Sequence, residues 1–152
     1  AEREVLLATL YRPYRESVRR QILAWCAEGL RVLHVSVHTF APRIGQSVRK
    51  ADVGLLYDPA VSHERAFCRK WRMAIGDIDP RVVVRRNYPY RGVTDGIASW
   101  LRREAPRRLY WGIELEVNQR LAAGPPARRS DLARILADSL ATCLGRKVGV
   151  GK

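Results

Sequence analysis

Two ionisable residues stand out because each belongs to an otherwise apolar segment. His38 follows the strand-like stretch 30–37, and Glu114 lies between Ile113 and Leu115. Apolar stretches rich in β-branched residues are typical of buried strands. Ligands of α/β sheets bind beyond the carboxyl ends of strands, so we expect both side chains at strand ends, in one site. An imidazole and a carboxylate are suited to holding a metal or to acid–base catalysis.

Each of these residues also has a structural interpretation. His38 could be a buried histidine with satisfied ring nitrogens, and Glu114 could pair with one of the many arginines, because an unpartnered buried carboxylate is costly. His34 lies on the same face of the strand as His38 and is interpreted as a core or supporting histidine. His63 falls at the start of a predicted helix and is interpreted as solvated.

The loop 84–92 is the third candidate, because it combines Arg86, Asn87 and Tyr90 with further arginine and tyrosine side chains. Arginine pairs bidentately with carboxylates, so such a mixture is suited to a small carboxylated ligand. A packed surface loop without a ligand is the alternative.

The elements that must position these residues alternate along the chain. Apolar residues at three- and four-residue steps predict helices over 2–28 (interrupted at Pro13), 61–75, 94–103 and 130–143. Apolar stretches predict strands over 30–37, 53–57, 81–84 and 109–117. This alternation predicts an α/β fold of three layers, with a mixed, mostly parallel sheet between helices. We expect one domain over residues 1–144 and a flexible tail over 145–152.

Composition limits the class of protein. A hydrophobic fraction of 47% over 152 residues excludes global disorder, and no apolar run is long enough to cross a bilayer. The cysteines, Cys26, Cys68 and Cys143, are odd in number and widely spaced, which favours reduced thiols in a cytoplasmic protein. The net charge of +13 attracts anions, but the arginines are scattered in pairs, so we expect no specific nucleic-acid binding and no membrane binding.

Five segments, in this order, resemble the N-formylglutamate amidohydrolase family. They are residues 37–42 (VHTFAP), 51–56 (ADVGLL), 86–90 (RNYPY), 92–96 (GVTDG) and 112–119 (GIELEVNQ). The resemblance implies the mixed sheet of the zinc carboxypeptidase (phosphorylase/hydrolase-like) fold. It also implies a zinc-dependent hydrolase that removes the N-formyl or N-acyl group from an acidic amino acid.

The resemblance also assigns roles. His38 matches one zinc ligand, and Glu114 matches the glutamate that activates the zinc-bound water. Asn87, Tyr90 and Arg86 are expected to shape the pocket for the acidic N-acyl amino acid.

The family's early Glu-His ligand segment would precede Ala1, so the chain resembles the C-terminal two thirds of such an enzyme. We therefore expect an N-terminally incomplete version, with a homo-oligomer or a complementing N-terminal segment as partner. The alternatives are a catalytically incomplete binding domain of this fold and a carboxypeptidase-like peptidase.

Overall fold

The fold is built around a four-stranded sheet in the order β1-β6-β4-β5, seen in a computed structural model that describes residues 2–94 and 96–146. The strands are β1 (Val32–Phe40), β6 (Tyr110–Asn118), β4 (Val53–Leu56) and β5 (Val84–Arg86). β1 is parallel to β6 and β4 is parallel to β5, whereas β4 and β6 are antiparallel. The sheet is therefore mixed and mostly parallel, as predicted. A separate hairpin of β2 (Arg43–Ile44) and β3 (Ser47–Val48) follows β1.

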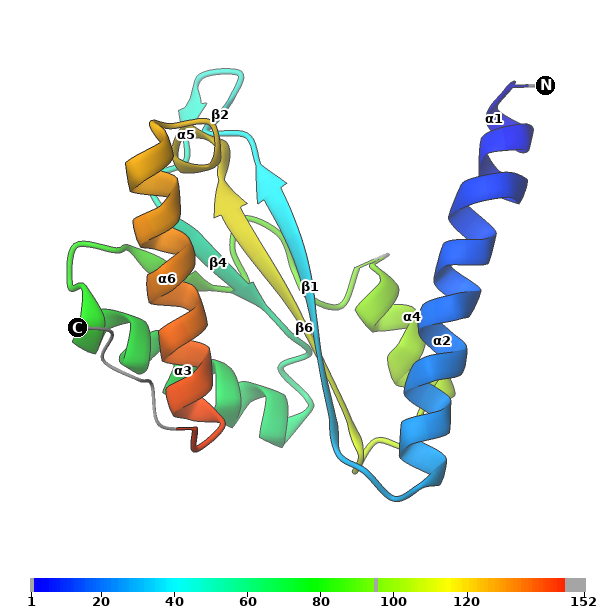
Figure 1. The fold of residues 1–152 in the computed structure, drawn as a ribbon. Coiled ribbons are helices and arrows are strands. Elements are labelled where there is room, and N and C mark those ends of the chain that lie inside the picture. The colour runs from blue at the N-terminus through cyan, green and yellow to red at the C-terminus, as the bar shows by residue number, and fades with distance from the viewer. Residues whose placement is uncertain (1, 95, 147–152) are drawn as a thin grey trace.

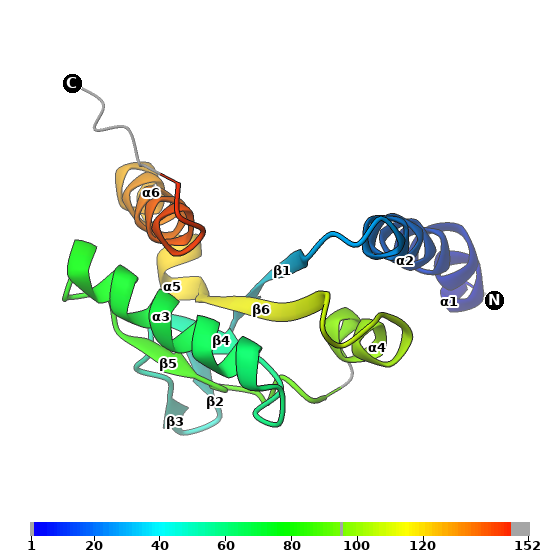
Figure 2. The same cartoon turned by 90° about the horizontal axis from the view of Figure 1, so that it is seen from below.

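Helices cover both faces of the sheet. They are α1 (Glu2–Leu6), the π-helical turn η1 (Leu7–Tyr11), α2 (Arg12–Ala27), α3 (Ser62–Ile78), α4 (Ile97–Glu104), α5 (Gln119–Ala122) and α6 (Pro126–Cys143). Figure 1 shows α3 and α6 on one side of the strands and α2 and α4 on the other, and Figure 2 shows the same separation from below. This confirms the predicted three layers. No helix among the described residues combines the length and the apolar character needed to cross a membrane.

The larger core lies between the sheet and the pair α3 and α6. Leu55 and Ile113 from the strands pack with Trp71 of α3 and Ile135 of α6, and all four are buried. The indole Nε1 of Trp71 donates a hydrogen bond to Ser139 Oγ at 3.0 Å, so the large ring is buried without an unpaired donor. A smaller cluster, which includes Ile22, Leu101 and Tyr110, joins α2 and α4 to the other face.

The predicted position of the site residues at strand ends is wrong. β1 continues through Thr39 to Phe40, so His38 lies inside the strand, and Glu114 lies in the middle of β6. Because β4 and β6 are antiparallel, the carboxyl ends of the strands do not meet at one edge of the sheet.

Two helix boundaries also differ. The interruption expected at Pro13 is the π-helical turn before it, which leaves Pro13 in the first turn of α2, where a missing N–H is tolerated. Helix α6 begins at Pro126, with Pro125 as its N-cap, and not at Ser130.

Cys26, Cys68 and Cys143 are free and buried, as expected for reduced thiols. The flexible tail predicted over 145–152 lies outside the described residues from residue 147 onward.

Candidate active site

One face of the β1–β6 pair gathers the polar residues of the sheet. In the parallel register His38 lies opposite Glu116 and Ser36 lies opposite Glu114. Side chains two residues apart share a face of a strand, so these four side chains lie on the same side. The alternate residues of the two strands pack against α3 and α6. Sheet geometry thus places an imidazole next to two carboxylates.

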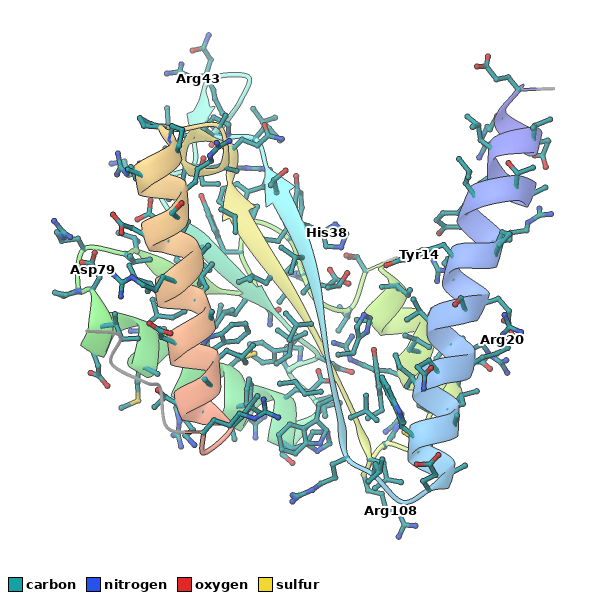
Figure 3. The ribbon with its side chains drawn as sticks, viewed as in Figure 1. Tyr14, Arg20, His38, Arg43, Asp79 and Arg108 are labelled. Atoms are coloured by element: carbon teal, nitrogen blue, oxygen red, sulfur yellow. The ribbon has the colours of Figure 1, made fainter. Side chains whose placement is uncertain are left out.

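His38 is exposed on this face, and its Nε2 lies 2.9 Å from Ser36 Oγ. It lines a pocket of about 390 Å³ together with Tyr14 of α2 and Gly96. Figure 3 shows His38 projecting from β1 toward the side of the sheet where α2 carries Tyr14. The ring is accessible to a ligand that enters between β1 and the N-terminal helix.

Glu114 is buried, with 9% of its surface exposed. Its carboxylate lies against the backbone of Gly96, where an added Cβ would stand only 1.8 Å from Oε1. Burial raises the pKa of the Glu114 carboxyl, and the nearby His38 and Arg102 oppose that rise. A carboxyl of this kind takes up a proton more readily than an exposed one, which suits a general base near neutral pH.

Glu116 is a functional candidate that the sequence reasoning did not single out. It is 6% exposed, and its Oε2 is buried with no hydrogen-bond partner among the described residues. Burial raises its pKa, His38 lowers it, and the neighbouring Glu114 raises it further. Its spacing from Glu114 was visible in the sequence, but the pairing with His38 required the strand register.

Asn87 holds the loop that leads to Gly96. Its backbone has a positive φ of 48°, and its Oδ1 accepts hydrogen bonds from the backbone nitrogens of Tyr57 (3.0 Å) and Gly92 (3.2 Å). Gly92 lies so close to β4 that an added Cβ would stand 2.2 Å from the Tyr57 nitrogen. The structure therefore shows Asn87 positioning the loop, and a direct contact with substrate stays a prediction.

Tyr90 belongs to a group of aromatic and arginine side chains near the His38 end of the face. Its hydroxyl accepts a hydrogen bond from Arg49 Nη1 at 3.1 Å, and the Arg49 guanidinium stacks over the rings of Tyr90 and Phe40. Arg49 is also among the charges that lower the pKa of Glu116. No spacing or motif in the sequence pointed to Arg49.

Asn118 fixes the backbone that carries Arg49. This fully buried amide donates from Nδ2 to the carbonyl oxygens of Arg49 (3.2 Å) and Ala51 (2.8 Å). Its Oδ1 accepts from the Arg120 nitrogen and caps α5. The end of β6 thereby sets the position of the Arg49 guanidinium relative to the site.

Arg86 is not brought to this face. Val84 packs on the core that faces α3, and side chains alternate along a strand, so Arg86 lies on that same side. Burial raises the pKa of the Cys68 thiol in α3, and the positive charge of Arg86 acts in the opposite direction. The geometry gives Arg86 no part in the pocket.

The other two histidines have structural surroundings. His34 Nδ1 lies 2.8 Å from the Tyr110 hydroxyl, and burial lowers the His34 pKa, with Arg102 acting in the same direction. This supports the interpretation of His34 as a core histidine. His63 is not solvated as expected, because its ring stacks on Trp111 at a centroid distance of 5.0 Å and its Nε2 is buried.

A buried ion pair that the sequence did not reveal ties the site to its surroundings. Glu64 of α3 is fully buried and accepts from Arg102 Nε (3.0 Å), the Gly112 nitrogen (2.8 Å) and the Asp58 nitrogen (3.0 Å). Arg102 also donates to the Gly92 carbonyl at 2.6 Å. The pair joins α3, α4, β6 and the loop that ends at Gly96.

The donor set for a zinc ion is incomplete. Among residues 2–94 and 96–146 no group of three or more His, Cys, Asp or Glu side chains is placed to hold a metal. Structural and catalytic zinc sites take at least three protein ligands. The described residues therefore do not by themselves fit a zinc ion, although His38 is an exposed imidazole beside a buried carboxylate.

Comparison with known proteins leads to the family that the sequence resembles. The family model of N-formylglutamate amidohydrolase matches residues 1–123. The crystal structure of gene product Atu2144 from Agrobacterium tumefaciens is 26% identical, with a TM-score of 0.72, over 95% of this chain and 54% of that chain. N-formylglutamate amidohydrolase from Ralstonia eutropha JMP134 is 15% identical, with a TM-score of 0.58, over 93% of this chain and 54% of that one, and supports the fold alone.

No curated protein sequence matches this chain. The chain spans about half the length of the two solved structures. Since the family model covers most of the sequence, the chain belongs to the N-formylglutamate amidohydrolase family.

Proposed function

We propose that this protein provides the general base and the substrate pocket of an amidohydrolase that cleaves the N-formyl or N-acyl amide of an acidic amino acid. The observation that carries the proposal is the pairing of His38 with two buried carboxylates across neighbouring parallel strands, next to an open pocket. Family membership supports the reaction class, and the name of the Ralstonia relative, an N-formylglutamate amidohydrolase, supports an acidic N-acyl amino acid as the substrate type.

Glu114 is the proton acceptor in this proposal. Its carboxyl is buried, its pKa is raised, and the backbone of Gly96 limits where it can move. A base held in this way takes a proton from the attacking water and returns it to the leaving amine. Glu116 lies opposite His38 in the strand register and places a second buried carboxylate beside that ring.

Arginine side chains select the acidic substrate. Arg49 is half-buried, its guanidinium is held by the rings of Phe40 and Tyr90, and it lies near Glu116. A guanidinium held by aromatic rings loses little entropy when it binds a carboxylate. The net charge of +13 adds a long-range attraction for anions.

Zinc is part of the proposal through the family resemblance. His38 would supply one ligand, and the other ligands would come from outside the described residues. A zinc ion held there would polarise the acyl carbonyl and lower the pKa of its water.

The first test is zinc binding to the purified chain, measured by calorimetry, with His38→Ala as the variant and His63→Ala as the matched control. Tight one-to-one binding that is lost only in His38→Ala would support His38 as a ligand. Binding that is equal in both variants would refute the role of His38.

The second test measures substrate recognition separately from the metal. Binding of N-formyl-L-glutamate and N-acetyl-L-glutamate is followed by NMR titration of the wild type, of Arg49→Met, and of Arg43→Met as an exposed control. We expect saturable binding that Arg49→Met weakens about tenfold or more, the effect of losing one charge-assisted contact of about 1.5–3 kcal/mol. Binding that is unaffected by Arg49→Met would refute the role of Arg49 in ligand recognition, and the absence of saturable binding would refute the proposed substrate class.

Turnover measurements distinguish the roles of the two carboxylates. Glu114→Gln is expected to abolish formate release while ligand binding is retained, and Glu116→Gln is expected to shift the pH profile. Loss of turnover in Glu116→Gln with near-normal turnover in Glu114→Gln would reverse the two roles.

The incomplete metal site favours one second candidate, a catalytically inactive binding domain of the same fold. Such a domain would bind the acidic ligand through Arg49 and show no hydrolysis under any metal condition. For either function we propose a cytoplasmic location, which the three free, buried cysteines support.

A further inference from the structure

A second cavity lies on the face of the sheet opposite to His38 and Glu114. It has a volume of about 520 Å³ and is formed where β1 begins, beside the first half of α3 and the end of α6. Figure 1 shows these three segments at the lower end of the molecule. Its wall residues Leu33 and Trp111 are opposite each other in the β1–β6 register and pack with the α3 and α6 core. The sheet therefore separates this cavity from the candidate active site.

Aromatic rings form one wall of this cavity. The His63 ring stacks on the Trp111 indole at a centroid distance of 5.0 Å and an interplanar angle of 26°. The Phe67 ring meets the same indole edge-on, with the ring centroids 6.0 Å apart. Leu33 and Leu144 add aliphatic surface. A mostly apolar cavity of this size is typical of sites for small organic molecules, and flat rings are suited to a planar ligand.

Two ring nitrogens in this wall are buried without a partner. They are Trp111 Nε1 and His63 Nε2, which have no hydrogen-bond partner among the described residues. An indole N–H can only donate, and buried polar groups are almost always paired, because an unpaired one has lost water without replacement. By contrast, Trp71 Nε1 in the same core donates to Ser139. The unpaired nitrogens indicate an occupant that carries a hydrogen-bond acceptor.

Two cations line the cavity, and its described lining residues include no carboxylate. Arg31 and Lys70 are exposed, and neither is in a salt bridge within residues 2–94 and 96–146. Lys70 Nζ donates to the Cys143 carbonyl at 3.0 Å, at the end of α6, where the backbone carries partial negative charge. This bond uses one of the three protons of the ammonium group. Cations beside unpaired donors favour an anionic group on the occupant.

From these observations we propose that this cavity binds a small planar aromatic carboxylate. The aromatic body lies against the rings of His63, Trp111 and Phe67, and the carboxylate accepts from Trp111 Nε1 and pairs with Lys70 and Arg31. A small inorganic anion would leave the aromatic wall uncovered, and a neutral aromatic compound would leave both cations unpaired. The proposal does not depend on hydrolytic activity, because the cavity shares no described lining residue with the His38 pocket.

The test is an NMR titration of the chain with cinnamate, with cinnamamide as the neutral analogue and acetate as the anion without a ring. The chain has four tryptophans, and the indole N–H signal that is missing from Trp111→Phe identifies Trp111. We expect cinnamate to move this signal saturably and to slow its exchange with water, while the other indole signals change little. Cinnamamide and acetate should each bind about tenfold more weakly or worse, because each lacks one of the two contacts.

Three substitutions by methionine separate the local charge from the net charge. Lys70→Met and Arg31→Met each remove one cation of the cavity. Arg69→Met removes the same charge from the neighbouring exposed position of α3, which does not line the cavity. We expect the first two to weaken cinnamate binding about threefold or more and Arg69→Met to leave it unchanged. Ala66→Trp fills the cavity from an exposed position of α3 and should abolish binding, with thermal unfolding to show that the fold is retained.

Four results would overturn the proposal. Cinnamamide or acetate binding as tightly as cinnamate would show that the cavity does not require an aromatic carboxylate. Shifts confined to the surroundings of His38 would place the ligand in the candidate active site instead. Equal binding by Lys70→Met, Arg31→Met and Arg69→Met would remove the role of the cations. The absence of saturable cinnamate binding would leave water as the only partner of the buried nitrogens.

Discussion

Replacing Arg102 by methionine should be among the most destabilising single changes in this protein. The Arg102 side chain is 11% exposed and its partner Glu64 is fully buried. Its guanidinium donates to Glu64 Oε1, to the Gly92 carbonyl and to the Gly112 carbonyl. Methionine fills a similar volume but donates no hydrogen bond, so it leaves a buried carboxylate and two buried carbonyls with fewer partners.

The magnitude follows from that geometry. Breaking a buried ion pair by removing one partner costs about 3–5 kcal/mol, because the remaining charge stays buried. Two backbone donors still reach Glu64, from Gly112 and Asp58, which favours the lower end of that range. For a chain of this size each kcal/mol lowers the melting temperature by about 2–4 °C, so a loss of about 3 kcal/mol lowers it by about 6–12 °C.

Urea and thermal unfolding of Arg102→Met and Arg103→Met measure this effect. Arg103 is the next residue of α4, is exposed, and undergoes the same chemical change, so its free energy of unfolding should stay within about 0.5 kcal/mol of the wild type. Equal stability of the two variants would refute the reasoning that Arg102 joins α3, α4 and β6 through a buried pair.

Two further changes test the site itself. Gly96→Ala adds a methyl group 1.8 Å from Glu114 Oε1, so the free energy of unfolding should fall by about 1–3 kcal/mol, measured by thermal unfolding. Gly76→Ala in α3 is the control: its added methyl group meets nothing within 4 Å, so the change should be neutral or stabilising. Burial raises the Glu116 pKa above 4.5, so the folded state holds this proton more tightly than the unfolded chain, and stability falls as pH rises from about 4.5 through the raised pKa. Glu116→Gln should therefore be more stable than the wild type at pH 7 and lose that advantage below pH 4.5. A stability difference between the two proteins that does not change with pH would contradict this assignment.

Apolar periodicity predicted the layers and the mostly parallel sheet because each strand and helix buries one continuous apolar face. The strand from Tyr110 to Asn118 and the helix from Ser62 to Ile78 lie close to where the sequence places them. The sequence could not show that β4 runs antiparallel to β6, because strand direction depends on the connection around the sheet and not on the residues of either strand. The site lies on the face of the sheet because β1 and β6 continue past His38 and Glu114, to Phe40 and Asn118.

The candidate site was predictable only in part for a similar reason. His38 and Glu114 stood out because each is an ionisable residue in an apolar stretch. Glu116 could have been found by the same signal, since it lies between Leu115 and Val117. Arg49 could not, because its position beside Tyr90 depends on Asn118, which holds the backbone from the far end of β6.

The exposure of His38 and the burial of Glu116 both follow from the places of their strands in the sheet. β1 is one of the two edge strands, so its side chains have a neighbouring strand on one side only, and His38 is exposed to solvent. Glu116 lies opposite His38 on the interior strand β6 and is buried, and its Oε2 has no hydrogen-bond partner among the described residues. The same pair of strands therefore offers one accessible imidazole and one enclosed carboxylate, which is why the described residues bring a base and an acid together without completing a metal site.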